Sequence, residues 1–300
     1  MQLQEVAQNF LRLLVMEPKL FSTIEFAEWK AFKGFVDSLS ENWAFRGQGH
    51  AGWVLNNAIE RTDFVHFHQQ VEADFLAEFQ RGARNYLSRD EIPGHTIEWL
   101  ALMQHHGAPT RLLDFSRSPF VASFFAFEQC HPETNHGIAI WAINVSFLKH
   151  RSLELLAGRY PIEAGEERNG IRESLFEQIF FNNDISVVFP VEPFRMNRRY
   201  SLQQSIFVST GKGYEPFMQQ LSFLGEDLEK AFIKMVLPAC LQKEVLRDLQ
   251  RMNLNRASLF PDLDGYAASM KLRYNSMRTP EESMQAHLSL MQDTSFRFIP

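Results

Sequence analysis

The sequence predicts an α+β fold, in which strands and helices surround one sizeable core. Two nearly continuous apolar runs, residues 137–145 (GIAIWAINV) and 185–191 (ISVVFPV), are typical of buried strands. Residues 63–87 and 120–127 instead carry apolar side chains at helical spacing or density. Hydrophobic residues make up 45% of the 300 and charged residues 22%, which is ordinary for a globular protein.

Composition excludes several classes of protein. The net charge of −6 gives no general basic field, so contact with nucleic acid would need a local patch. Cys130 and Cys240 are far apart, which argues against a disulfide framework and a zinc site. The N-terminus has no secretory pattern, and no apolar run has the length of a membrane span. We therefore expect a cytoplasmic protein that does not enter a membrane.

The first 40 residues predict two helices. Apolar residues share one face of the first helix, and the second spans residues 22–39 with Ser22 or Thr23 as its cap. The apolar residues of the first helix are Val6, Phe10, Leu13 and Leu14.

Residues 41–50 predict a strand that runs into a glycine-rich turn. Phe45 lies on one face of this strand with Trp43, and Arg46 lies on the other. Gly47 leaves room for another backbone to approach closely. Arg46 is suited to bind an anion, because its planar fork matches phosphate oxygens. The alternative is an arginine that only bonds carbonyl groups of the turn.

The long helix predicted over residues 63–87 carries His66 and His68. Two residues apart on a helix, these histidines cannot share a face and make a poor metal pair. Packing or surface roles suit them better.

Residues 95–128 form the central stretch of the sequence. A helix precedes Pro109, a short strand covers residues 110–115, and an apolar helix follows, with Pro119 in its first turn and Ser116 or Ser118 as its cap. The strand carries two charges, Arg111 and Asp114, to the edge of the core. They either pair with each other or with a neighbouring charge, or they form the polar floor of a cleft.

The second half predicts three more strands. Pro190 and Pro193 indicate that the strand over residues 185–191 ends near a sheet edge. Residues 205–209 and 231–237 predict the other two strands, and helices flank the last one.

Polar residues gather before the strand that begins at Ser205. Arg195, Arg198 and Arg199 are the densest basic cluster, typical of a solvated face or of phosphate contacts. Gln203 or Gln204 is placed to direct an amide into a cleft shared by the strands, although structural amides are commoner.

Several of these segments together resemble the FRG domain. The resemblance spans about residues 41–270, preceded by a helical segment over 1–40 and followed by a helical tail over 271–300. The sequence departs from the family pattern at Ser205, where glycine is usual, and at Phe115, where tryptophan is frequent. The segments that carry the resemblance are WAFRGQ at 43–48, QHHGAPTRLLDF at 104–115, SPFVA at 118–122, RYSLQQ at 199–204 and LFPDLDG at 259–265.

The FRG pattern is in turn similar, more distantly, to ADP-ribosyltransferases. That resemblance implies a mixed, largely antiparallel sheet surrounded by helices, and a site that uses NAD as substrate. The implied catalytic residues are Arg46, Asp114 and Gln203. The implied NAD-binding residues are Arg46, Gly47, Gln48, Thr110, Arg111 and Ser116, with Arg195, Arg198 and Arg199 as candidate nucleic-acid contacts.

The resemblance implies an NAD-dependent ADP-ribosyltransferase that acts as a bacterial toxin or phage-defence effector. Its acceptor would be nucleic acid, with RNA slightly favoured by Gln203 and the arginine cluster, or protein. A toxin would require a neutralising antitoxin protein. The alternatives are a non-catalytic module that binds a nucleotide or phosphate, and a metal-dependent nuclease that uses Asp114, Asp262 and Asp264. Helix capping explains the last two carboxylates better.

Overall fold

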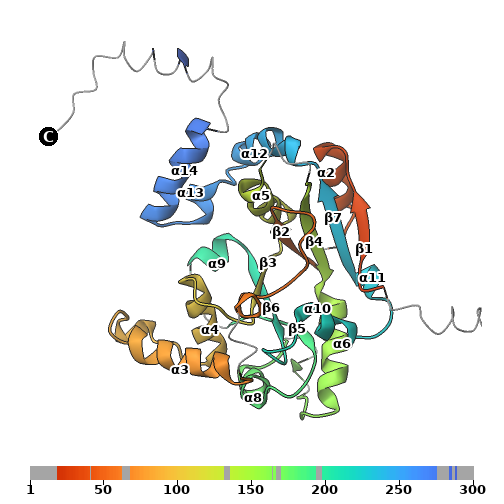
Figure 1. Cartoon of the computed structure of the whole chain (residues 1–300), viewed down its shortest axis with the longest axis vertical. Helices are drawn as coiled ribbons and strands as arrows, with labels where there is room; N and C mark the ends of the chain where they lie inside the picture. The colour runs from red at the N-terminus through yellow and green to blue at the C-terminus, as the bar shows by residue number, and fades with distance from the viewer. Residues whose placement is uncertain are drawn as a thin grey trace, which may run out of the picture.

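The protein folds around one seven-stranded sheet in the order β1-β7-β4-β2-β3-β6-β5 (Figure 1). The computed structural model describes residues 19–40, 42–62, 68–131, 136–163, 165–166, 170–193, 198–275, 284–285 and 288. β1 and β7 pair in parallel, and every other neighbouring pair is antiparallel. The predicted α+β fold with a mixed, largely antiparallel sheet is therefore confirmed. The strands are β1 (Ser22–Glu25), β2 (Trp43–Gln48), β3 (Leu113–Ser116), β4 (Ile138–Asn144), β5 (Val188–Val191), β6 (Ser205–Thr210) and β7 (Phe232–Leu237).

Helices cover both faces of the sheet (Figure 1). Helices α2, α5 and α12 contribute to one hydrophobic cluster, and α4, α6 and α8 contribute to the other. The α-helices are α2 (Trp29–Asp37), α3 (Val71–Ala83), α4 (Thr96–His105), α5 (Pro119–Gln129), α6 (Val145–Ala157), α8 (Glu173–Asn182), α9 (Arg198–Leu202), α10 (Phe217–Ser222), α11 (Leu228–Ala231), α12 (Gln242–Arg251), α13 (Arg256–Leu259) and α14 (Leu263–Asn275). The 3₁₀ helices are η1 (Ile59–Arg61), η3 (Arg89–Glu91) and η4 (Ala239–Leu241). Among the helices described, none combines the length and apolar character needed to cross a membrane.

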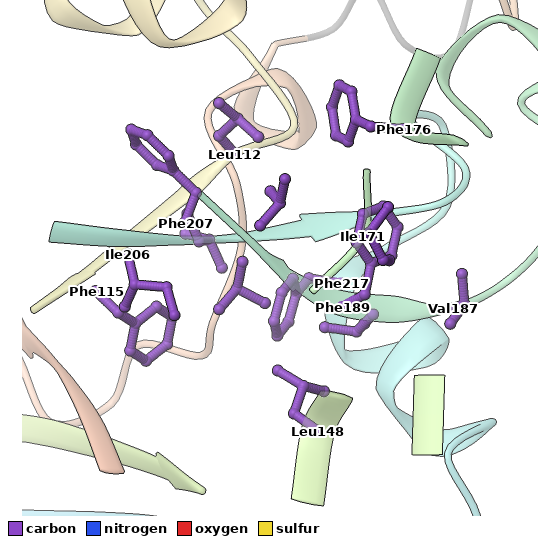
Figure 2. Packing of buried hydrophobic residues seen from close by; sticks show 14 of the residues in the cluster. Leu112, Phe115, Leu148, Ile171, Phe176, Val187, Phe189, Ile206, Phe207 and Phe217 are labelled. Carbon is purple, nitrogen blue, oxygen red and sulfur yellow. The ribbon is translucent and has the colours of Figure 1, made fainter. Parts of the chain in front are cut away.

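Burial on both faces explains the continuous apolar run of β4. Ala139, Trp141 and Ile143 join one cluster, while the alternating residues Ile138 and Ile140 join the other. Phenylalanine fills much of the space between sheet and helices: Phe207, Phe189 and Phe176, from β6, β5 and α8, belong to one buried cluster (Figure 2), and the ring centres of Phe176 and Phe189 are 6.1 Å apart. The high phenylalanine content thus builds the core.

Three predicted elements differ from the structure. The helix predicted from Ser22 is wrong over Ser22–Glu25, which forms edge strand β1 because its backbone bonds β7. Of the long helix predicted over residues 63–87, α3 covers only Val71–Ala83; residues 68–70 and 84–87 are not helical, and residues 63–67 lie outside the described residues. Helix α8 (Glu173–Asn182) has no counterpart in the prediction. The first predicted helix and most of the C-terminal tail lie outside the described residues.

The central stretch follows the prediction in its order of elements, but the strand predicted over residues 110–115 is shorter and covers Leu113–Ser116. Helix α4 ends at His105, ahead of Pro109, and β3 follows. Ser118, one of the two candidate caps, accepts a hydrogen bond from the backbone N–H of Val121 at 3.3 Å, and Pro119 begins α5. β5 lies at the edge of the sheet, as its prolines indicated.

Candidate functional site

A cleft of about 820 Å³ lies where β2 and β3 diverge. β2 pairs with β4 along its whole length, but it meets β3 only at the Phe45–Ser116 pair. Beyond that pair, the backbones of β2 and β3 do not pair with each other, and polar side chains from both strands line the cleft between them. Its polar lining residues include Arg46, Gln48, Arg61, Gln104, His105, Asp114, Ser116, Glu128, Arg199, Gln203 and Arg256.

Arg46 bridges the gap between the two strands. Its Nη1 donates to the main-chain carbonyl of Asp114 at 2.8 Å, in place of a backbone bond between β2 and β3. Its Nε is buried and bonds no acceptor among the described residues. Burial lowers the pKa of the Arg46 guanidinium, although nearby Asp114 opposes the shift. Arg46 thus has a structural bond and an unused donor.

The residues on either side of Arg46 have packing roles. Phe45 is buried in the core beneath α5. A Cβ on Gly47 would lie 1.9 Å from the carbonyl oxygen of Ala122, so only glycine allows β2 to cross α5 this closely. Gln48, also a predicted NAD-binding residue, accepts from Trp141 Nε1 at 2.8 Å and donates to the carbonyl of Val54 at 3.1 Å. Gly47 and Gln48 line the cleft, and each also has a structural reason for its identity.

Asp114 presents a carboxyl group to the cleft. Its Oδ2 accepts from Gln104 Nε2 at 2.5 Å, and Gln104 Oε1 accepts from the Thr110 hydroxyl at 2.6 Å. Burial raises the pKa of Asp114, and the positive charge of Arg46 partly offsets that effect. A carboxyl that is held in place and binds its proton more tightly than usual is suited to proton transfer. Thr110 itself is fully buried and orients Gln104 rather than lining the cleft.

Arg111 points away from the cleft, so the structure gives it a different role from the predicted NAD contact. Its Nε lies 2.6 Å from Glu72 Oε2, and its backbone N–H donates to Glu72 Oε1 at 2.7 Å. Its Nη1 donates to the carbonyl of Gly211 at 2.7 Å, and its guanidinium carbon lies 4.5 Å from the centre of the Phe180 ring. Both members of the ion pair are almost fully buried. Arg111 therefore pairs with Glu72 and not with Asp114, and it joins α3 to the sheet.

Gln203 rather than Gln204 lines the cleft. Gln203 Nε2 donates to the main-chain carbonyl of Leu259 at 3.0 Å. The main-chain carbonyl of Gln203 accepts from the Ser116 hydroxyl at 2.7 Å. Gln204 adopts a left-handed conformation with φ of 49°, and its carbonyl accepts from the backbone of Arg117. The start of β6 is thereby fixed beside β3, and Arg46, Asp114 and Gln203 meet in one cleft.

A further wall of the cleft is formed by Arg199, Arg256 and Phe260. Arg256 lies in α13, and Phe260 directly follows that helix. The guanidinium carbons of Arg199 and Arg256 lie 4.3 Å and 4.6 Å from the centre of the Phe260 ring. Arg256 Nη1 also lies 2.7 Å from Glu128 Oε2. Arg198 is exposed and does not line the cleft, and Arg195 lies outside the described residues. No local sequence pattern indicates Arg256 as a site residue, because only the tertiary fold brings α13 beside α9.

The cleft is electropositive although the protein is acidic. Its lining contains four arginines, Arg46, Arg61, Arg199 and Arg256, against two carboxylates, Asp114 and Glu128, an excess of two positive charges. Six buried side-chain atoms lack a hydrogen-bond partner among the described residues, and three of them are Nε of Arg46, Arg199 and Arg256. Buried donors without acceptors are costly. An anionic ligand would satisfy both the charge and the donors.

The late carboxylates have a structural role. Asp262 Oδ1 accepts from the backbone N–H of Gly265 at 2.6 Å, and Asp262 and Asp264 are both exposed. This is the capping role predicted for that turn. Within the part of the chain that the structure describes, no group of three or more His, Cys, Asp or Glu side chains is arranged to hold a metal ion.

Comparison with known families agrees with this site. Residues 41–135 match the family model of the FRG domain, and that segment contains β2, α4, β3 and α5. The matched segment includes Phe45, Arg46 and Gly47, which are a core residue, a cleft residue and a close-packing residue. Searches of curated proteins and of solved structures gave no match to the chain.

Proposed function

We propose that the FRG cleft binds NAD and that the protein transfers the ADP-ribose unit to an acceptor. The observation that carries this proposal is the meeting of Arg46, Asp114 and Gln203 from three strand regions at the opening between β2 and β3. These are the residue types and positions that the resemblance to ADP-ribosyltransferases implies.

The cleft has suitable size and chemistry for a dinucleotide. Its volume of about 820 Å³ lies within the range of cofactor sites. The unused Nε of Arg46 supports a role in holding the pyrophosphate, since guanidinium groups bind phosphate oxygens through paired donors. Phe125, Phe260 and Trp53 provide aromatic surface for the two flat rings of NAD.

The reaction needs only the substrate and an acceptor. The bond between ribose C1′ and the nicotinamide nitrogen breaks, its electron pair leaves with nicotinamide, and a lone pair of the acceptor forms the new bond to C1′. The ribose passes through an oxocarbenium-like state. Asp114 would take the proton released by the acceptor, and its raised pKa favours that role. The amide of Gln203 would orient the ribose or the acceptor beside C1′.

A planar acceptor suits the mouth of the cleft. Trp53 lies there with 53% of its surface exposed, and it stacks on His50 with ring centres 5.5 Å apart. Exposed aromatic rings bind unpaired bases. RNA is therefore favoured over protein as the acceptor. Modification of RNA would agree with a toxin or phage-defence role and with control by an antitoxin protein.

Labelled NAD incubated with the protein and cell lysate tests the proposal. Label should enter the RNA fraction, or the protein fraction if the acceptor is protein. Arg46→Gln and Asp114→Asn should each reduce transfer at least about 100-fold, in line with lost positioning or general-base catalysis. Arg117→Gln is the matched control, because Arg117 is exposed, pairs with Glu192 and does not line the cleft.

A non-catalytic nucleotide-binding module is the second candidate. The observation that favours it is that two site residues are already hydrogen-bonded within the protein. Arg46 donates to the Asp114 main-chain carbonyl, and Gln104 donates to the Asp114 carboxyl. Tight NAD binding without release of nicotinamide would establish this function and reject the transferase.

A further inference from the structure

We infer that Arg199 and Arg256, assembled around Phe260, form a phosphate-binding subsite separate from Arg46. The two arginines come from α9 and α13, which contact each other (Figure 1), and both arginines line the cleft. The subsite takes a phosphate group carried by a nucleotide or nucleic acid. The proposed function bears on which molecule carries that phosphate, whereas the binding chemistry follows from the residues themselves.

The geometry gathers two positive charges at one aromatic ring. Both guanidinium carbons lie within 4.6 Å of the Phe260 ring centre, so cation–π attraction orients the arginines. Phe260 also packs against Phe125 of α5 at 5.9 Å between ring centres, and this contact helps to hold the ring in place. Two like charges at one ring repel each other, and an anion bound beside them would relieve that repulsion.

The charges are only partly balanced by the protein. Arg256 pairs with Glu128 at 2.7 Å. No carboxylate lies within ion-pair distance of Arg199 in the described part of the chain. The Nε atoms of both arginines are buried without an acceptor. One positive charge without a carboxylate partner and two N–H donors without an acceptor therefore remain.

Titratable side chains surround this corner. Burial and the nearby Arg199 lower the pKa of His105, which favours its neutral imidazole. Asp114 and Asp262 are acidic groups near this corner: burial raises the pKa of Asp114 although Arg199 opposes the shift, and Asp262 opposes the lowering of the pKa of His105. A phosphate matches this arrangement, because its oxygens accept several N–H donors at once and its charge offsets both arginines.

Calorimetric binding of two probes identifies the source of the phosphate. ADP-ribose represents the dinucleotide, and a short single-stranded RNA oligonucleotide represents the acceptor. Neither is turned over without NAD, so a failure of this inference is distinct from a failure of the transfer reaction. Arg199→Gln should weaken at least one probe by about 10-fold or more, the loss expected for a charge-assisted hydrogen bond. Arg117→Gln should bind both as the wild type does.

A second variant should change the affinity for the probe in the opposite direction. Glu128→Gln removes the carboxylate that competes for Arg256, so the same probe should bind several-fold more tightly. A tighter complex cannot result from misfolding, which separates binding from structural damage.

The pattern of results decides the inference. Weakening of ADP-ribose binding assigns the subsite to the dinucleotide, and weakening of oligonucleotide binding alone assigns it to the acceptor. Unchanged affinity of folded Arg199→Gln for both probes, or no gain with Glu128→Gln, would overturn the inference. Thermal unfolding of each variant confirms that it is folded.

Discussion

Arg111 and Arg46 approach the same strand, β3, yet the fold gives them opposite environments. Arg111 bonds Glu72, Asn183 and carbonyls near the end of β6, and it lies against an aromatic ring. Arg46 bonds one carbonyl and leaves a buried Nε unused. An arginine whose donors are satisfied by the protein holds the structure together, whereas an unsatisfied one at a cleft is available to a ligand.

The same contrast extends to the carboxylates. Glu72 is fully engaged with Arg111. Asp114 receives its bond from a neutral amide, and burial raises its pKa.

Arg111→Met should have the largest effect. It leaves Glu72 as a buried charge without its partner, which costs about 3–5 kcal/mol of folding free energy. Urea unfolding followed by circular dichroism measures this loss. The double variant Arg111→Met/Glu72→Met should regain most of it, because an apolar pair can replace a buried ion pair. A single variant as stable as the wild type would show that Arg111 is not structural.

Gly47→Ala should rank second. The new methyl group would meet the Ala122 carbonyl, and forcing β2 away from α5 should cost about 1–3 kcal/mol, as overpacking typically does. Gly34→Ala is the matched control: Gly34 lies in α2 with no atom within 4 Å of the added methyl group, and alanine should stabilise the helix by about 0.5–1 kcal/mol. Equal effects of the two changes on melting temperature would contradict this account.

Local patterns in the sequence predicted much of the fold. The proline at 109, the cap at Ser118 and the two-sided apolar run of β4 depend on neighbours in the chain, so these elements were predicted correctly. Ser22–Glu25 was predicted as helix, because its strand conformation depends on pairing with β7, more than 200 residues away. No local pattern carries that information.

The candidate site was predictable only in part. The family resemblance indicated Arg46, Asp114 and Gln203, and all three line one cleft. It also indicated Arg111, whose partner Glu72 lies on a helix 39 residues earlier. Arg256 and Phe260 were not predicted as site residues, because their role arises from the packing of α13 against α9. Charge alone could not separate ligand-binding arginines from structural ones.

Arg46→Gln should change stability by less than about 2 kcal/mol, because losing one charged hydrogen bond is partly offset by removing a buried charge. ADP-ribose affinity should nevertheless fall about 10- to 100-fold. Unfolding and calorimetry on the same sample test both statements. A destabilisation as large as that of Arg111→Met would show that Arg46 mainly joins the two strands, and the contrast between the arginines would fail.

Asp114→Asn should have the smallest effect on stability, visible mainly in its dependence on pH. The folded carboxyl has a pKa above its ordinary value of 3.8, so the folded state binds the proton more tightly than the unfolded state. The stabilising contribution is complete below pH 3.8 and is lost as pH rises through the folded pKa. The asparagine variant should lack this decline.

Glu60 contributes a decline of the same sign between about pH 4.5 and 7, because burial raises its pKa to about 7. The measurement is therefore the difference in unfolding free energy between Asp114→Asn and the wild type across pH 4 to 8, in which the Glu60 contribution cancels. The variant should gain stability relative to the wild type as pH rises. A constant difference would mean that Asp114 titrates normally in the fold, and its proposed role as a base would lose the support of its buried environment.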